Sequence, residues 1–300
     1  MTAKSMLSAL SSTHPDPAQY SFELATLAYR SGEFSDCNAR LAELEKTVAP
    51  NGRLEGLAGR CAAGSKQYEA AEEHLERAVQ LDPEDLSNYN VLIEFELHEN
   101  HLNSAMKLAS QAAIRFPKHL EVWMWKGSTE LESGHYHEAI ESYRHAMSDQ
   151  AANSEALLGL ANAQLLSGDP SEVYKTYEQG IRQFPAEARF LVGFANALMQ
   201  SPESAHRDVA DRAQASLKKA IQLDGSSPAA HYLLGQSFLD QGRLTDSLGE
   251  LQTAEMKDPD NASIHFVLER VFRRLGRTDE ARKEFVLFEQ TKGTRDNDPL

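Results

Sequence analysis

Residues 120–153 read LEVWMWKGSTELESGHYHEAIESYRHAMSDQAAN, and the fold of the chain can be inferred outward from this stretch. Its apolar and small residues fall at Trp123, Gly127, Gly134, Tyr136, Ala139, Tyr143 and Ala146. This spacing predicts two short amphipathic helices joined by a glycine turn, with small residues where two backbones must approach closely. The stretch is therefore a helix-turn-helix element of 34 residues.

The same pattern recurs along the chain with a period of 34 residues. Eight repeats begin at Ala18, Gly52, Leu86, Leu120, Ser154, Ala188, Pro228 and Ala262. Small side chains prevail at positions 8, 20 and 27 of the repeat, and proline at position 32 would end the second helix. Large side chains at position 24 are expected to fill the space between helices; they include Leu75, Tyr143, Tyr177, Leu217, Leu251 and Phe285.

These positions resemble the tetratricopeptide repeat, which places Trp, Leu-Gly, Tyr, Ala, Phe and Pro in 34 residues. The repeat PAAHYLLGQSFLDQGRLTDSLGELQTAEMKDPDN, from Pro228, is similar to that pattern nearly as closely as residues 120–153. The resemblance covers residues 18–292 and implies an all-α, right-handed superhelical solenoid of helix-turn-helix repeats. Residues 1–17 would be a lead-in, the last helix, from Asp279 to about Lys292, a closing cap, and residues 293–300 a flexible tail.

Two features depart from the regular pattern. Lys126, Glu96 and Glu130 stand where apolar or large residues are usual, and they are expected to alter packing locally. The repeat from Ala188 is six residues longer than the period, with its extra residues around 201–207, SPESAHR, between its two helices. Because the entropy of loop closure grows only slowly with length, we expect a tolerated surface loop there.

Composition and charge exclude some classes of partner. The 300 residues are 41% hydrophobic and 25% charged, as in globular proteins, and no apolar run approaches the roughly 18 residues of a membrane span. We therefore expect a soluble protein. A formal net charge of −15 repels phosphate backbones and anionic lipid headgroups, so neither nucleic acid nor a membrane surface is an expected partner.

The N-terminus and the cysteines bear on the compartment. The segment MTAKSMLSALSSTHPDP has too short an apolar stretch for a secretory signal, which slightly favours the cytoplasm over export. Cys37 and Cys61 cannot form a metal site by themselves. Two buried thiols in a reducing compartment are the expected state, whereas a disulfide, the alternative, would argue for export.

No catalytic motif interrupts the repeats. The sequence has no Gly-rich phosphate loop, nucleophile elbow, zinc-protease helix motif or cysteine pair at ligand spacing, so we expect neither an enzyme nor a cofactor. A metal site or proton-sensitive patch is a less favoured alternative at His98, His101, His135 and His137. His101 and His135 share position 16 of adjacent repeats, but exposed histidines in turns usually ligate nothing.

Helical geometry predicts a binding surface on the first helix of each repeat. Positions 7, 8 and 11 face neighbouring helices, so positions 2, 5, 9 and 12 form a stripe that faces elsewhere. In tetratricopeptide proteins this stripe lines a concave groove for an extended peptide, and the resemblance implies the same use here. The candidate partner-binding residues are Met124, Trp125, Ser128, Leu158, Asn162, Arg189, Val192, Asn196, Tyr232, Gln236, Arg270 and Arg273.

Three carboxamides carry most of this prediction. Asn162, Asn196 and Gln236 occupy position 9 of successive repeats, and an amide can both donate to and accept from a partner's backbone. They would otherwise cap helices or meet water. Apolar residues at position 5 would contact partner side chains or be buried within the solenoid. The repeat alignment assigns Trp123 to packing and Trp125 to the groove edge.

The favoured function is a non-catalytic protein-interaction scaffold that binds a neutral or basic segment. Arg270, Arg273, Arg274 and Arg277 form one basic face, which is either solvated or receives an acidic group. The alternative is self-assembly into homo-oligomers through exposed apolar residues near the ends of the stack. The candidates for such contacts are Phe285, Phe288, Phe22 and Tyr20.

Overall fold

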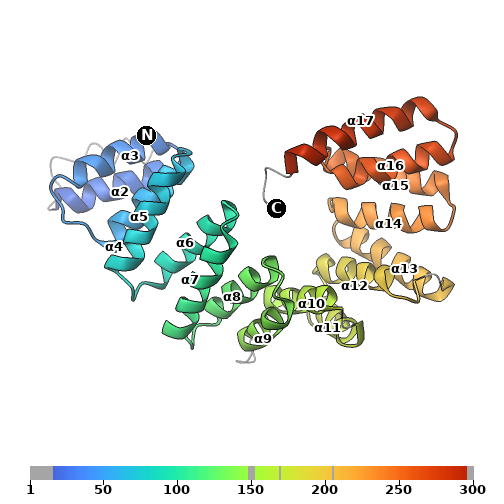
Figure 1. Cartoon of the computed structure of the whole chain (residues 1–300), viewed down its shortest axis with the longest axis horizontal. Coiled ribbons are helices and arrows are strands. Elements are labelled where there is room, and N and C mark those ends of the chain that lie inside the picture. The colour runs from blue at the N-terminus through green and yellow to red at the C-terminus, as the bar shows by residue number, and fades with distance from the viewer. Residues whose placement is uncertain (1–15, 148–152, 169, 205, 296–300) are drawn as a thin grey trace. The chain divides into compact units, whose positions relative to one another are not determined.

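The computed structural model describes residues 16–147, 153–168, 170–204 and 206–295 (Figure 1). These ranges contain sixteen α-helices and no strand, which confirms the predicted all-α class. Two compact units, Met1–Ser133 and Gly134–Leu300, are called the N-terminal unit and the C-terminal unit below. Each is described by itself. None of the described helices combines the length and apolarity that a membrane span requires.

Paired helices follow one another along each unit (Figure 1). The N-terminal unit contains α2 (Pro17–Arg30), α3 (Phe34–Leu44), α4 (Gly52–Gly64), α5 (Tyr68–Leu81), α6 (Leu86–His98), α7 (Leu102–Arg115) and α8 (Leu120–Glu132). The C-terminal unit contains α9 (Tyr136–Ala146), α10 (Ser154–Ser167), α11 (Pro170–Gln183), α12 (Ala188–Gln200), α13 (Arg207–Leu223), α14 (Pro228–Asp240), α15 (Leu244–Lys257), α16 (Ala262–Arg274) and α17 (Thr278–Arg295).

Local sequence explains where the first helices begin. The side chain of Asn51 caps α4, that of Asn153 caps α10 and that of Ser227 caps α14, each accepting hydrogen bonds from free backbone N–H groups of the first turn. The turn between α14 and α15 needs a left-handed residue, and Gly242 provides it with φ of 74°. Caps and turns therefore end and restart the helices at the repeat period.

The core runs between paired helices, as the small-and-large pattern predicts. Leu75, Tyr177 and Leu251 at position 24 are at most 1% exposed. The position-24 pattern predicted that Phe285 fills the space between helices, whereas the self-association alternative placed it on an exposed end; it is 51% exposed. The packing prediction was wrong because no described helix follows α17 to cover this face. α17 also continues to Arg295, beyond the predicted start of a tail at residue 293.

A close approach of helices recurs in the C-terminal unit. A Cβ atom added to Gly193 on α12 would lie 2.3 Å from the ring of Tyr177 on α11, and one added to Gly159 on α10 would lie 2.3 Å from Tyr143 on α9. Ordinary side-chain contacts are longer than 3 Å, so both tyrosines rest where only glycine leaves room. Tyrosine at position 24 and glycine at position 6 of the next repeat thus pack together twice.

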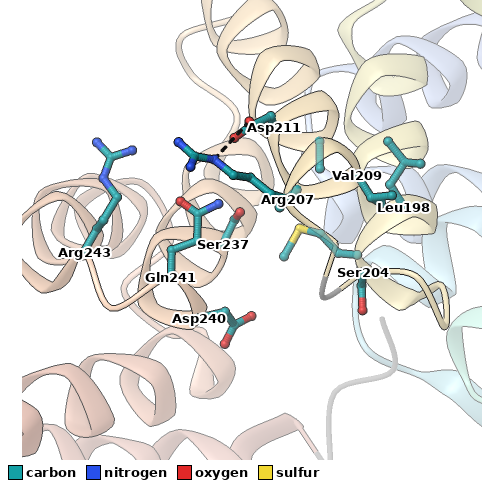
Figure 2. Close-up of a pocket in the computed structure, with 12 residues that line it drawn as sticks. Leu198, Ser204, Arg207, Val209, Asp211, Ser237, Asp240, Gln241 and Arg243 are labelled. Carbon is teal, nitrogen blue, oxygen red and sulfur yellow. Dashed lines mark ion pairs between the residues drawn. The ribbon is translucent and has the colours of Figure 1, made fainter.

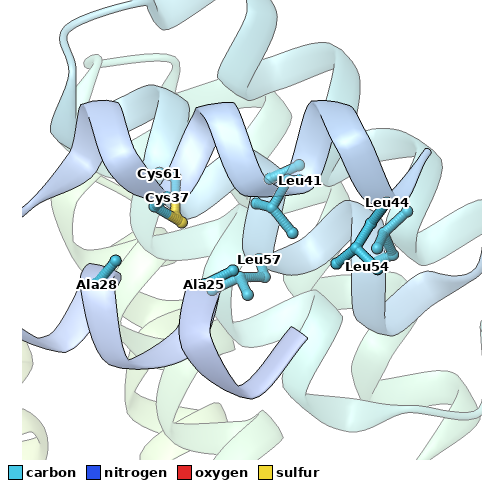
Figure 3. Close-up of a cluster of buried hydrophobic side chains, with 9 residues drawn as sticks. Ala25, Ala28, Cys37, Leu41, Leu44, Leu54, Leu57 and Cys61 are labelled. Carbon is cyan, nitrogen blue, oxygen red and sulfur yellow. A yellow bond between two sulfur atoms is a disulfide. The ribbon is translucent and has the colours of Figure 1, made fainter. Parts of the chain in front are cut away.

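Cys37 and Cys61 form a disulfide, so the expectation of two thiols was wrong (Figure 3). The bond joins α3 to α4, with the two Cα atoms 6.1 Å apart, inside a cluster of buried side chains that includes Leu41 and Leu57. The two positions lie 24 residues apart in sequence, on helices from different repeats. Their contact depends on how consecutive helix pairs pack.

The charged departures from the pattern are accommodated by ion pairs. Lys126 and Glu130 form a salt bridge along α8, and buried Glu96 accepts from His101 at 2.9 Å. Trp123 and Trp125 are not divided between core and surface as the alignment predicts. Both are half-buried and pack against the buried cluster that contains Tyr89 and Ile93. The Trp123 indole also donates to the Pro117 carbonyl at 3.0 Å.

Candidate functional site

The C-terminal unit places nine of the twelve predicted binding residues on successive first helices. α10 contacts α12, α12 contacts α14 and α14 contacts α16, so equivalent positions of these helices form a continuous row. We call positions 2, 5, 9 and 12 of these four helices the first-helix row. Its predicted binding residues are Leu158, Asn162, Arg189, Val192, Asn196, Tyr232, Gln236, Arg270 and Arg273. Met124, Trp125 and Ser128 lie on α8 of the N-terminal unit, where all three are half-buried.

The three carboxamides of the row have different surroundings. The side-chain oxygen of Asn162 accepts a hydrogen bond from the Tyr177 hydroxyl at 2.8 Å, and that of Asn196 accepts from Gln200 Nε2 at 3.0 Å. Gln236 is half-exposed, with no side-chain hydrogen bond to the residues that the structure describes. None of the three is a cap of a described helix, so the row offers amide N–H groups as donors.

Tyr177 holds Asn162 in this orientation. Its side chain, on α11, is fully buried against α10 and α12, and burial raises the pKa of its hydroxyl to about 12. The hydroxyl is therefore protonated at neutral pH and donates to Asn162. With its oxygen occupied by this hydrogen bond, Asn162 has its NH2 group left as a donor.

The side chains at position 5 become more exposed toward the C-terminal end of the row. Leu158 is only 7% exposed, so at this position the alternative of burial within the solenoid holds. Val192 and Tyr232 are half-buried, and Phe266 is 47% exposed. Burial raises the pKa of Tyr232, an effect that the positive charge of Arg270 opposes. The accessible apolar surface of the row is therefore provided by α12, α14 and α16.

Arg189 links the first two helices of the row. Its guanidinium binds both carboxylate oxygens of Glu155 on α10, at 3.0 and 2.5 Å, and its Nε donates to Glu187 at 2.7 Å. The hydrogen bond from Arg189 lowers the pKa of Glu187. Since the donor fork of Arg189 is occupied by these carboxylates, this residue positions α12 against α10 and has little donor capacity left for a partner.

The basic face of α16 is largely engaged within the protein. Arg273 pairs with Glu269, Arg274 donates to the Leu239 carbonyl at 3.0 Å, and Arg277 pairs with Glu280 at 2.8 Å. Arg270 has no ion pair among the described residues and lies over the ring of Phe266, 6.0 Å from its centroid. Arg270 is exposed and is thus the member of this face whose guanidinium is held by neither an ion pair nor a backbone carbonyl among the described residues.

A cavity of about 750 Å³ lies beside the row, where the longer repeat carries its extra residues (Figure 2). The ends of α12 and α14 and the start of α13 enclose it, together with Ser204 of the inserted segment. Its lining includes Met199, Ser204, Arg207, Ser237, Asp240 and Arg243. Ala205 of the insertion lies outside the described residues. The sequence predicts a tolerated loop here and misses the cavity, although the insertion directly follows Met199, at position 12 of the row.

The cavity carries charge of both signs. Arg207 faces Asp211 at 3.8 Å (Figure 2), and Arg243 pairs with Asp246 at 2.6 Å. Burial raises the pKa of Asp240, and the nearby Arg270 and Arg274 oppose this rise. Asp240 therefore connects the cavity electrostatically to the exposed Arg270 of the row.

The sequence offers His98, His101, His135 and His137 as an alternative metal site. Of these four, only His101 belongs to a group of possible metal ligands among the described residues. Exposed His98 pairs with Glu99 at 2.8 Å, and His135 and His137 are exposed in the C-terminal unit. Within the described ranges, two groups of three side chains have ligating atoms within 4.8 Å of one another. These groups are Glu72, Glu96 and His101, and Glu255, His265 and Glu284.

The residues predicted for self-association differ in accessibility. Tyr20 is 3% exposed, so its assignment to an exposed surface was wrong: its ring is part of the buried side of α2. Phe22 is half-buried beneath the guanidinium of Arg53, 4.3 Å from its ring centroid. Phe285 is exposed, and Phe288 packs 5.4 Å from Phe266 between ring centroids.

Known protein families match most of the chain. One model of the tetratricopeptide repeat matches residues 22–85, and another matches 130–191 and 210–270. A model of subunit 3 of the anaphase-promoting complex, or cyclosome, matches residues 64–146. A comparison with curated proteins finds no significant match.

Solved structures share the fold at low sequence identity. A tetratricopeptide repeat protein from Parabacteroides merdae is 15% identical with a TM-score of 0.70, covering 85% of this chain and 98% of its own. The C-terminal part of a repeat protein from Cytophaga hutchinsonii is 12% identical with a TM-score of 0.58, covering 81% and 97%. A chain of the APC/C hetero-tetramer Cut9–Hcn1 is 12% identical with a TM-score of 0.59, covering 89% and 52%.

Proposed function

Because the chain belongs to the tetratricopeptide repeat family, we propose that it is a non-catalytic interaction scaffold whose first-helix row binds an extended segment of a partner protein. The observation that carries the proposal is the set of amide donors on α10, α12 and α14. An extended backbone offers carbonyl groups at regular intervals, and successive helices offer N–H groups to them whatever the partner's side chains are.

Accessible apolar groups beside these amides support the same surface. Val192 and Tyr232 flank the carboxamides, and the cavity at the insertion is large enough for a side chain of the partner. A formal net charge of −15 favours a neutral or basic segment. The APC/C chain with the same fold is part of a hetero-tetramer, which is consistent with a role in assembly.

A peptide selection tests this proposal. Peptides selected from a random library on the whole protein should bind at least about tenfold more weakly when Asn162, Asn196 and Gln236 are all replaced by Ala. Each lost hydrogen bond contributes about 0.5–1.5 kcal/mol, and about 1.4 kcal/mol corresponds to a factor of ten. The comparison is made in the unaltered protein and again in proteins that carry Tyr177→Phe, so that the loss of the acceptor of the buried Tyr177 hydroxyl is separated from the loss of the amides.

A matched control replaces three carboxamides that lie on second helices. Gln183, Gln222 and Gln252 are exposed on α11, α13 and α15 of the same unit, and their replacement by Ala should leave peptide affinity unchanged. Both variants should keep the helical circular-dichroism signal. If the variant of Asn162, Asn196 and Gln236 binds peptide as tightly as the control variant, the assignment of the site is refuted.

Self-association is the second candidate, and the exposed end of α17 favours it. Phe285 and Val286 are 51% and 53% exposed, next to the Phe266–Phe288 contact. An apolar end face of a repeat stack can be covered by a second copy. Sedimentation of the proteins from the peptide-binding experiment, at high micromolar concentration, distinguishes peptide binding from self-association. A monomer that binds peptide contradicts assembly as the main function.

A further inference from the structure

Three side chains with metal-ligating atoms meet between the last three helices of the C-terminal unit. Glu255 lies on α15, His265 on α16 and Glu284 on α17, and their ligating atoms are all within 4.8 Å of one another. His265 is 1% exposed and Glu284 is 8% exposed, whereas Glu255 is half-exposed. The group is thus buried on two sides and open to solvent through Glu255.

The geometry of His265 directs one ring nitrogen at the carboxylates. Its Nε2 lies 2.7 Å from the carbonyl oxygen of Pro259, which can only accept a hydrogen bond, so Nε2 carries a hydrogen and donates it. Its Nδ1 lies 2.8 Å from Glu284 Oε2 and 4.0 Å from Glu255 Oε1. A histidine that ligates a metal typically donates its other ring N–H to a carbonyl or carboxylate in this way.

The repeats provide an internal comparison for this group. Glu and His also pair at positions 4 and 23 of two other repeats, as Glu55 with His74 and as His231 with Glu250, each at 2.7 Å. A pair of this kind, without a third side chain, only links the two helices of one repeat. The pair of His265 and Glu284 differs because Glu255, at position 28 of the preceding repeat, supplies a third ligand. Ile221 stands at the position that corresponds to Glu255 before the His231 pair. Glu45 stands there before the Glu55 pair, but it is exposed and belongs to no group of ligating atoms among the described residues.

We propose that Glu255, His265 and Glu284 bind a divalent transition-metal ion, with zinc as the expected occupant, and thereby join α15, α16 and α17. One imidazole and two carboxylates are ligands that zinc accepts, and water on the exposed side of Glu255 completes a tetrahedral set. A divalent cation also neutralises two carboxylates that are otherwise close together in a partly desolvated place. This site is separate from the first-helix row, so either proposal can fail alone.

Zinc titration of the full chain, without a histidine tag and after treatment with a chelator, tests the proposal. Calorimetry gives the number of zinc ions bound per chain. This number is needed because Glu72, Glu96 and His101 form a second group of possible zinc ligands. Glu255→Gln preserves the size of a half-exposed side chain. It should abolish the binding of one zinc ion or weaken the affinity for that ion at least about tenfold. Zinc should raise the melting temperature of the unaltered protein more than that of this variant.

Glu250→Gln is the matched control, since it alters the corresponding pair with His231, which has no third ligand. This variant should bind as many zinc equivalents as the unaltered protein. The proposal is overturned if the unaltered protein binds no zinc, if Glu255→Gln retains all equivalents at full affinity, or if Glu250→Gln loses as much zinc as Glu255→Gln. In those cases His265 and Glu284 form a structural pair only.

Discussion

Replacing Gly193 with alanine is expected to destabilise the C-terminal unit, although alanine normally strengthens a helix. Gly193 lies within α12, and a Cβ there would be 2.3 Å from Cε1 and 2.6 Å from Cζ of Tyr177. The ring is fully buried, so it cannot move aside without disturbing its neighbours. The same movement would break the hydrogen bond from Tyr177 to Asn162.

The expected magnitude follows from three contributions. Overpacking of a close-packed site costs about 1–3 kcal/mol. Loss of the tyrosine hydrogen bond costs about 1 kcal/mol, and the higher helix propensity of alanine returns about 1 kcal/mol. The net change is a loss of about 1–3 kcal/mol in the free energy of unfolding. Peptide affinity should also fall, because Asn162 would lose its fixed orientation.

Gly249 provides the matched control. It lies within α15, is exposed, and a Cβ added there would have no neighbour within 4 Å. Gly249→Ala should therefore increase the free energy of unfolding by about 0.5–1 kcal/mol. Urea unfolding monitored by circular dichroism compares the two variants through their midpoints, provided that the slopes agree. If Gly193→Ala is as stable as Gly249→Ala, the close packing of Tyr177 against α12 is refuted.

Two further predictions concern the N-terminal unit. Replacing Cys37 and Cys61 together by Ala should lower the free energy of unfolding by about 3.5 kcal/mol, because the bond closes a separation of 24 residues. Thermal unfolding with and without reductant checks this, since reductant should lower the melting temperature of the unaltered protein and not that of the variant. A reductant-dependent melting temperature of the variant would contradict the prediction. Burial raises the pKa of Glu96 above its ordinary 4.5, with His101 opposing the rise. The folded state then binds the proton more tightly than the unfolded state, so stability falls as pH rises through the raised pKa. Glu96→Gln should flatten this decline in urea midpoints measured between about pH 4 and 7, and an unchanged pH slope would exclude Glu96 as its source.

Part of the candidate site could be predicted without coordinates. Position 9 of consecutive repeats places Asn162, Asn196 and Gln236 on α10, α12 and α14, because a fixed period brings equivalent residues to equivalent helical faces. Their hydrogen-bond partners could not be predicted in the same way. Tyr177 reaches Asn162 from the second helix of its own repeat, which depends on side-chain rotamers and on the room left by Gly193.

Other features do not follow from the periodic pattern. The cavity beside Met199 results from the path of the insertion, and loop length alone does not determine a path. The exposure of Phe285 results from the end of the stack, where the pattern is the same but the neighbour is absent among the described residues. A pattern describes what each position can pack against, and only the folded chain shows whether that neighbour is there.

The sequence by itself determined the helical repeat, its period and the family, because small, large and turn-forming residues at fixed spacing satisfy local backbone geometry and the nearest-neighbour packing of a solenoid. The tertiary structure alone decided that Cys37 bonds to Cys61, that Arg189 is occupied by Glu155, and that Glu255 joins His265 and Glu284. Each of these contacts joins different repeats. Such contacts depend on the distance and rotation between helix pairs, which are set by packing and not by spacing along the chain.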